Sequence, residues 1–180
     1  PLYPLNACKM NHKEIDGSLP KIAETIRTIL NSHPDQKGII HTGSYKIQKY
    51  IQENLSFSRL IFPERGGVED ALTLHKESKE PTVLVSPAVT EGVDGKGDLV
   101  RFQVVCKIPY PYLGDRRIKI LAERDWSWYN YQAAKTFIQA LGRGVRSETD
   151  WCKNYVLDDG LERFVKQANI GYYVNDCLQS

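Results

Sequence analysis

Three features that would classify a chain quickly are missing from these 180 residues. There is no G-x-x-x-x-G-K-[ST] phosphate loop and no C-x-x-C pair, and no apolar run approaches the roughly 20 residues that cross a bilayer. We therefore expect no membrane partner. We also expect reduced, mostly buried thiols without a metal at the four scattered cysteines, which are Cys8, Cys106, Cys152 and Cys177.

A large excess of charge of either sign is also missing. The formal net charge is +2, and basic and acidic residues are nearly balanced in each half of the chain. A broad basic surface for nucleic acid is therefore absent, so any such binding must be local. With 41% hydrophobic and 26% charged residues, the composition is that of one globular domain.

The first ten residues, PLYPLNACKM, lack the basic region and apolar stretch of a signal peptide. We expect an intracellular protein, cytoplasmic or nuclear. Because the chain begins with Pro1 rather than Met, we expect a fragment or a processed chain. Residues 1–17 are mixed and rich in turn formers, which predicts a leading segment or linker before the domain.

Strands and helices alternate after this segment. Apolar periodicity predicts helices over residues 17–30, 45–55, 66–78 and about 125–141, with Ser18 capping the first and a closing helix or turn over 160–170. Short apolar runs predict strands over 37–44, 59–63, 81–87, 102–109 and 154–159. Strands that are apolar throughout favour an α/β fold, with a mostly parallel sheet covered on both faces.

Ligands of such sheets bind beyond the carboxyl ends of the strands. The first loop at such an end is HTGSY, where Thr42, Ser44 and Tyr45 precede a helix. Small hydroxyls and backbone N–H groups there can form a nest for a phosphate. Ser44 can equally cap the following helix, and the two roles are compatible.

A second loop, residues 86–98, combines Gly92, Gly95 and Gly97 with the acidic Glu91 and Asp94. The carboxylates can accept from a ribose hydroxyl or hold an arginine. A flexible turn is the simpler interpretation.

The third candidate is QALGRGVRSETD, in which Gln139, Gly142, Arg143 and Arg146 lie within eight positions. Spacings of three, four and seven place side chains on one helix face, and two forked guanidiniums suit a polyphosphate. The alternative is a helix end, where arginine stabilises the dipole and Gly144 ends the helix.

Two segments are less specific. WSWYNY, residues 126–131, has aromatic rings that could stack on bases, although a helix leading into a core stripe more often buries them. KIPYPYLGD, residues 107–115, is interpreted only as a loop.

The run TEGVDGKGDLVRFQVVCKIPYPYLGD, followed by QALGRGVRSETDW, resembles superfamily 2 helicases of the XPD and DinG branch. HTGSYKI is similar to that family's motif IV, SPAVTEGVD to motif V and QALGRGVR to motif VI. The resemblance covers about residues 18–170, in the order of the second motor domain. It implies a three-layer α/β/α RecA-like C-terminal helicase domain over residues 18–180.

The resemblance also explains phosphate-binding arginines without a phosphate loop. It implies that ATP and Mg²⁺ are held mainly by a first lobe absent from this sequence. Arg143 and Arg146 would reach the γ-phosphate across the cleft, and Gln139 would orient water. The residues expected on the ATP side of motifs V and VI are Glu91, Gly92, Asp94 and Gly142.

The implied partners are that first lobe and single-stranded DNA, in repair or replication. The expected DNA contacts are Thr42, Ser44, Tyr45, Ser86 and Thr90, with Lys46 and Lys96 on weaker grounds. An iron–sulfur cluster, where the family has one, belongs to the first lobe.

Two other functions remain open. A degenerate RecA-like module could bind nucleic acid or protein without catalysis, although the intact Gln139, Arg143 and Arg146 count against it. An RNA helicase lobe is the other alternative, and the particular residues of the TEGVD and QALGRGVRSE segments disfavour it.

Overall fold

The computed structural model describes residues 1–11, 13–87, 97–145 and 150–178. The strands are β1 Leu2–Cys8, β2 Gly38–His41, β3 Leu60–Ile61, β4 Val83–Ser86, β5 Phe102–Val105 and β6 Lys153–Asp158. The α-helices are α1 Ile15–Ser32, α2 Tyr45–Asn54, α3 Val68–Glu77, α4 Arg116–Arg124, α5 Trp126–Leu141, α6 Leu161–Gln167 and α7 Gly171–Val174. Short 3₁₀ turns are η1 Gly97–Leu99, η2 Gly142–Gly144 and η3 Asn175–Cys177.

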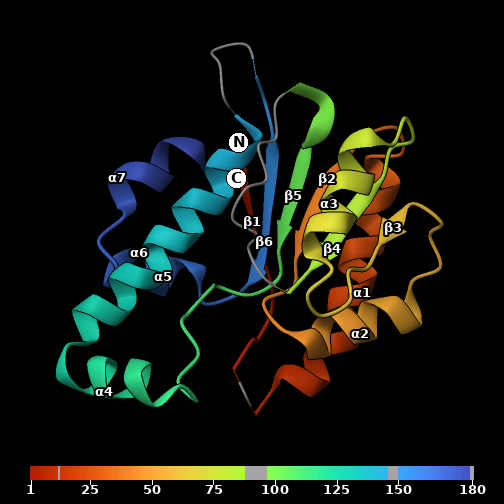
Figure 1. The fold of residues 1–180 in the computed structure, drawn as a ribbon. Coiled ribbons are helices and arrows are strands. Elements are labelled where there is room, and N and C mark those ends of the chain that lie inside the picture. The colour runs from red at the N-terminus through yellow and green to blue at the C-terminus, as the bar shows by residue number, and fades with distance from the viewer. Residues whose placement is uncertain (12, 88–96, 146–149, 179–180) are drawn as a thin grey trace.

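The six named strands form one sheet in the order β1-β6-β5-β2-β4-β3, and every pair in it is parallel. Parallel neighbours need crossover connections, which the helices between them supply. Figure 1 shows the sheet between two groups of helices. The predicted α/β fold with a parallel sheet is therefore confirmed.

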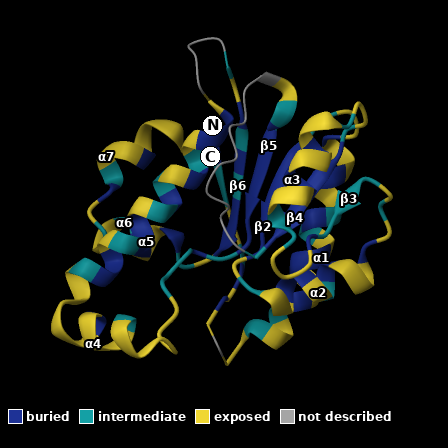
Figure 2. Ribbon diagram, in the orientation of Figure 1, coloured by how far each residue is buried: buried dark blue, intermediate teal, exposed yellow. Residues whose placement is uncertain are grey.

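Alternate residues along each strand build a core on each face of the sheet. Ile40 of β2 and Val104 of β5 pack with α1 and α2 on one face. On the other face, Leu84 of β4 packs with α3, and Val105 packs with α5 and α6. The central strands β2, β4 and β5 are thus buried on both sides, while the outer faces of the helices are exposed (Figure 2).

The expectation of a turn-rich leading segment is wrong for residues 2–8. They form β1, which pairs with β6 at the edge of the sheet. Only the two ends of this strand are buried, so no apolar run marks it in the sequence. An edge position also tolerates Pro4, since an edge strand can spare a backbone donor.

Two helix predictions also need correction. Helix α1 begins at Ile15, and Ser18 lies inside it, where its hydroxyl donates to the Lys9 carbonyl at 2.9 Å instead of capping the helix. Helix α4 was missed, because it is short and buries only Ala122.

The expectation that most of the cysteines are buried is confirmed. Cys8, Cys106 and Cys152 are buried and free, and Cys177 is free and exposed. Across the described ranges, none of the helices combines the length and the hydropathy needed to cross a membrane.

Candidate functional site

The carboxyl ends of neighbouring strands meet at one edge of the sheet. The Thr42 N–H, just beyond β2, donates to the Ser86 carbonyl at the end of β4 over 2.8 Å. Gly43 follows with φ +68°, and a Cβ there would lie 3.1 Å from the Lys107 Cβ, just beyond β5. The loop after β2 thus lies directly against both neighbouring strand ends.

Of the hydroxyl-bearing DNA contacts predicted on this edge and described by the structure, Ser44 and Tyr45 reach solvent. Ser44 is partly exposed and caps α2 by accepting from the Ile47 N–H at 3.3 Å, which confirms the predicted cap. Tyr45 is 47% exposed. Thr42 is fully buried, with its hydroxyl donating to the Ser44 carbonyl at 3.0 Å, and Ser86 is only 1% exposed. Thr42 and Ser86 therefore shape the loop from inside.

Cations surround the start of α2. The Arg65 guanidinium lies 4.7 Å from the centre of the Tyr45 ring, and Lys46 forms an ion pair with Asp16 of α1. Arg65 could not be singled out by sequence reasoning, because it comes from the distant loop between β3 and α3.

The expected common face of Gln139, Gly142 and Arg143 is wrong. Helix α5 ends at Leu141, and the 3₁₀ turn η2 changes the direction in which the following side chains point. Gln139 and Gly142 are exposed, whereas Arg143 is buried, with 9% exposure. Arg143 therefore does not project from this lobe into solvent.

A row of buried polar side chains crosses the face of the sheet that α3, α5 and α6 cover. The Gln103 amide donates to Asn154 Oδ1 at 2.9 Å, and its Oε1 lies 3.1 Å from His41 Nε2. Burial lowers the pKa of His41 to about 4; the Gln103 bond opposes this shift, and the nearby Arg143 charge adds to it. The buried imidazole is thus held neutral, and the charge of Arg143 contributes to this.

Sequence reasoning missed this row of His41, Gln103 and Asn154. The available signal was a polar residue inside each of three short strands that are otherwise apolar or half-apolar. Such residues must find partners on a buried face.

Several predicted site residues lie outside the described ranges. These are Thr90, Glu91, Gly92, Asp94, Lys96 and Arg146. Within the described ranges, no group of three or more His, Cys, Asp or Glu side chains is arranged to hold a metal ion.

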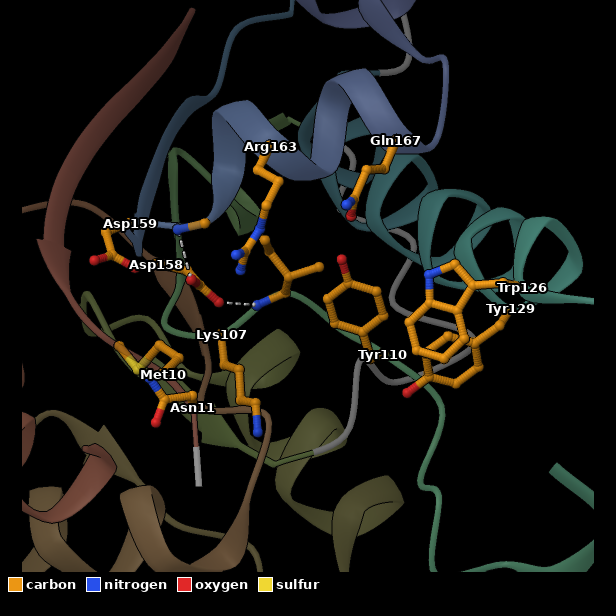
Figure 3. Close-up of a pocket in the computed structure, with 12 residues that line it drawn as sticks. Met10, Asn11, Lys107, Tyr110, Trp126, Tyr129, Asp158, Asp159, Arg163 and Gln167 are labelled. Carbon is orange, nitrogen blue, oxygen red and sulfur yellow. Dashed lines mark hydrogen bonds between the residues drawn. The ribbon is translucent and has the colours of Figure 1, made fainter. Parts of the chain in front are cut away.

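A pocket of about 500 Å³ opens at the same edge, beyond β5 and β6 (Figure 3). Its buried carboxylate, Asp158, accepts from the N–H groups of Ile108 at 3.1 Å and Gly160 at 2.9 Å. Burial raises the pKa of Asp158 although these two bonds oppose the shift. Of its lining residues, only Trp126 and Tyr129 belong to a segment that was considered from the sequence as a possible base-stacking site.

The family model described as the helicase C-terminal domain matches residues 26–175. The chain belongs to this family. The matched range contains the loop after β2, the segment after β4 and the turn after α5, as the resemblance of motifs IV, V and VI implied.

Two curated relatives place this domain among XPD-like helicases. The ATP-dependent DNA helicase XPD of Sulfolobus acidocaldarius is 26% identical over 143 residues, covering 71% of this chain and 25% of the relative. The Fanconi anemia group J protein homolog of Gallus gallus is 23% identical over 158 residues, covering 71% of this chain and 13% of the relative. The chain thus spans a quarter or less of these relatives.

Solved structures share the fold. An XPD helicase structure superposes with a TM-score of 0.71 at 22% identity, covering 93% of this chain and 33% of that one. Xpd4 of S. tokodaii gives 0.67 at 22% identity, covering 94% and 36%. The helicase C-terminal domain described here therefore has the RecA-like fold of these XPD structures.

Proposed function

We propose that this chain is the second motor lobe of an ATP-dependent DNA helicase and works against a first lobe that binds ATP and Mg²⁺. The observation that carries the proposal is the family match over residues 26–175, which includes all three motif segments. The relative named as an ATP-dependent DNA helicase supports the choice of DNA over RNA. A role in DNA repair or replication follows from the same relationship.

The two arginines of the motif VI segment are assigned different parts. Arg146 is the finger that reaches the γ-phosphate across the cleft, where its charge stabilises the transition state. Arg143, which is buried and whose charge acts on His41, is a positioning residue that holds the turn after α5 against the sheet. Gln139 orients the attacking water from the exposed side of α5.

The ATP side of the lobe is completed by the segment after β4. Asp94 contacts the ribose or pairs with the motif VI arginines, and Glu91 holds the two segments together. Gly92 and Gly142 allow the backbone to come close to the nucleotide.

The carboxyl edge of the sheet is assigned to the DNA strand. Ser44 and Tyr45 are the accessible contacts, while the buried Thr42 and Ser86 hold the loop in shape. Thr90 adds a contact from the next loop. Contacts of this kind go to phosphates, so binding should be nearly independent of sequence.

The finger assignment is tested in the protein that contains both lobes. Arg146→Ala should lower DNA-stimulated ATP turnover by about 10³- to 10⁵-fold, because one charge at the transferring phosphate is lost. ATP binding, measured with a fluorescent analogue, should stay close to that of the unchanged protein. Arg146→Lys should also be damaging, since lysine lacks the bidentate fork.

Arg124→Ala is the matched control, because this exposed arginine lies at the end of α4, away from the motif segments. Its turnover should be unchanged. Normal turnover in Arg146→Ala would reject the finger role. Stimulation by RNA instead of DNA would favour the RNA helicase alternative, and absence of any turnover in the two-lobe protein would favour a degenerate binding module.

A further inference from the structure

The pocket at the carboxyl edge adjoins the proposed DNA path. Lys107 lines its mouth and also lies against the loop after β2, since the Gly43 Cβ position is 3.1 Å from the Lys107 Cβ. A strand that passes Ser44 therefore reaches Lys107 next. The pocket, of about 500 Å³, has the size of a small-molecule site.

One wall of the pocket is a fixed aromatic stack. The rings of Tyr110 and Tyr129 are stacked with centroids 5.5 Å apart, and Trp126 lies 4.9 Å from Tyr129. Tyr129 is buried, and its hydroxyl donates to the Pro111 carbonyl at 2.9 Å. Trp126 nevertheless remains 55% exposed, so a large π-face is held in place at the rim.

Polar groups face this wall from α6. Arg163 and Gln167 are four residues apart, so they share a helix face. In Figure 3 Gln167 extends toward Tyr110, and Arg163 extends into the pocket on the Asp158 side. Two carboxylates, Asp158 and Asp159, also line the pocket. Arg163 lies on the carboxylate side of the pocket, because one of its guanidinium nitrogens and an Asp158 oxygen are 3.7 and 3.0 Å from the same Gly160 Cβ position. A guanidinium with carboxylates nearby suits the neutral edge of a base more than a phosphate. Lys107 at the mouth suits a phosphate.

We propose that this pocket receives one base of single-stranded DNA, stacked on Trp126, with its phosphate at Lys107 and its edge at Arg163 and Gln167. The inference rests on the proposed function, because it assumes that a strand follows the carboxyl edge. It adds a base subsite to a path that otherwise contacts phosphates. Stacking of this kind tolerates any base, since every base has a π-face.

The test uses an oligothymidylate that carries one 2-aminopurine, titrated with the protein that contains both lobes. Stacking on Trp126 should quench the 2-aminopurine fluorescence. Trp126→Ala should weaken strand binding by about 5- to 100-fold and remove the quenching, whereas Trp126→Phe should retain most of both. Tyr131→Ala is the matched control, because Tyr131 is 62% exposed on the same helix and does not line the pocket.

Salt dependence separates the two cations. Lys107→Gln should reduce the slope of log K against log salt by about 0.7, the value for one contact to a single strand. Arg163→Gln should weaken binding with the slope nearly unchanged, because its partner is an uncharged base edge. Equal slope changes in both variants would overturn the assignment of base and phosphate.

Failure of this inference is distinguishable from failure of the proposed function. If the unchanged protein binds the strand and Trp126→Ala binds as Tyr131→Ala does, the base subsite is rejected and the proposed DNA path stands. If the unchanged protein does not bind the strand, both are rejected. If thymidine monophosphate displaces the strand at equal concentration, the pocket is a site for free nucleotides and the strand proposal is overturned.

Discussion

The two ends of helix α5 contrast in an instructive way. At its start, on the carboxyl edge of the sheet, Trp126 leaves 55% of its surface exposed. Just beyond its end, Arg143 is only 9% exposed and lies near the neutral His41. Globular proteins normally bury tryptophan and expose arginine. Both ends of one helix thus reverse the usual preference, and a functional role is proposed above for each of them.

Different interactions hold the two ends of α5 in place. The aromatic end is held by capping, since Asp125 accepts from the N–H groups of Ser127 at 2.9 Å and Trp128 at 3.0 Å. The arginine end is held by close packing, because Gly144 lies directly against Cys152 and the Val100 carbonyl. The first end can remain open to a ligand, whereas the second has little room to change.

The close packing at the second end is broken most directly by Gly144→Ala. The added Cβ would lie 2.4 Å from the Cys152 Cβ and 3.0 Å from the Val100 carbonyl oxygen, so the turn that carries Arg143 must shift. We expect a loss of about 3 kcal/mol in the free energy of unfolding, measured by urea denaturation.

Gly142→Ala, two residues earlier, is the control, because nothing lies within 4 Å of its Cβ position. It should change the unfolding free energy little. Equal stability of the two variants would show that the turn after α5 is not tightly packed and would remove the contrast between the helix ends.

Much of the sheet could be predicted from the sequence. The apolar runs of β2, β4 and β5 are buried at every position, so hydrophobicity alone located them. Ser44 was likewise predictable as a cap, because capping depends on local sequence. Strand β1 was not, since its pairing with β6 joins segments about 150 positions apart and only its ends are buried.

The candidate site was less predictable. Helical spacing predicted that Gln139 and Arg143 share one face of a helix. In the structure the α-helix changes to a 3₁₀ turn at Gly142, and Gly144 then packs against Cys152. Sequence periodicity reveals neither the change of helix type nor this tertiary contact. The pocket beyond β5 and β6 gathers side chains from four separate segments of the chain. Composition and spacing carry no information about such a gathering.

The buried His41 near Arg143 should make stability depend on pH. Its pKa is lowered from 6.5 to about 4 in the folded protein, so below pH 6.5 the unfolded chain takes up a proton that the folded chain does not. The contribution of His41 to the free energy of unfolding is therefore fully present above pH 6.5 and is lost as pH falls toward 4. Between pH 7 and 5 this group should account for about 2 kcal/mol.

The measurement compares urea unfolding of the unchanged chain with that of His41→Gln, which keeps an amide for Gln103. The variant should lose less stability on acidification. This difference isolates His41 from Asp158, whose raised pKa acts in the opposite direction. Identical pH dependence in the two proteins would show that the His41 imidazole takes up a proton equally in the folded and the unfolded chain, which contradicts a lowered pKa.

The smallest effect concerns the other helix start on the carboxyl edge, that of α2. Ser44→Ala removes the bond to the Ile47 N–H and should cost about 1 kcal/mol of unfolding free energy. Ser127→Ala in the first turn of α5 should cost little, because Asp125 provides that cap. Single-strand binding decides what else Ser44 does. A cap alone predicts unchanged affinity for oligothymidylate at low salt, whereas a phosphate contact predicts weaker binding in Ser44→Ala and unchanged binding in Ser127→Ala.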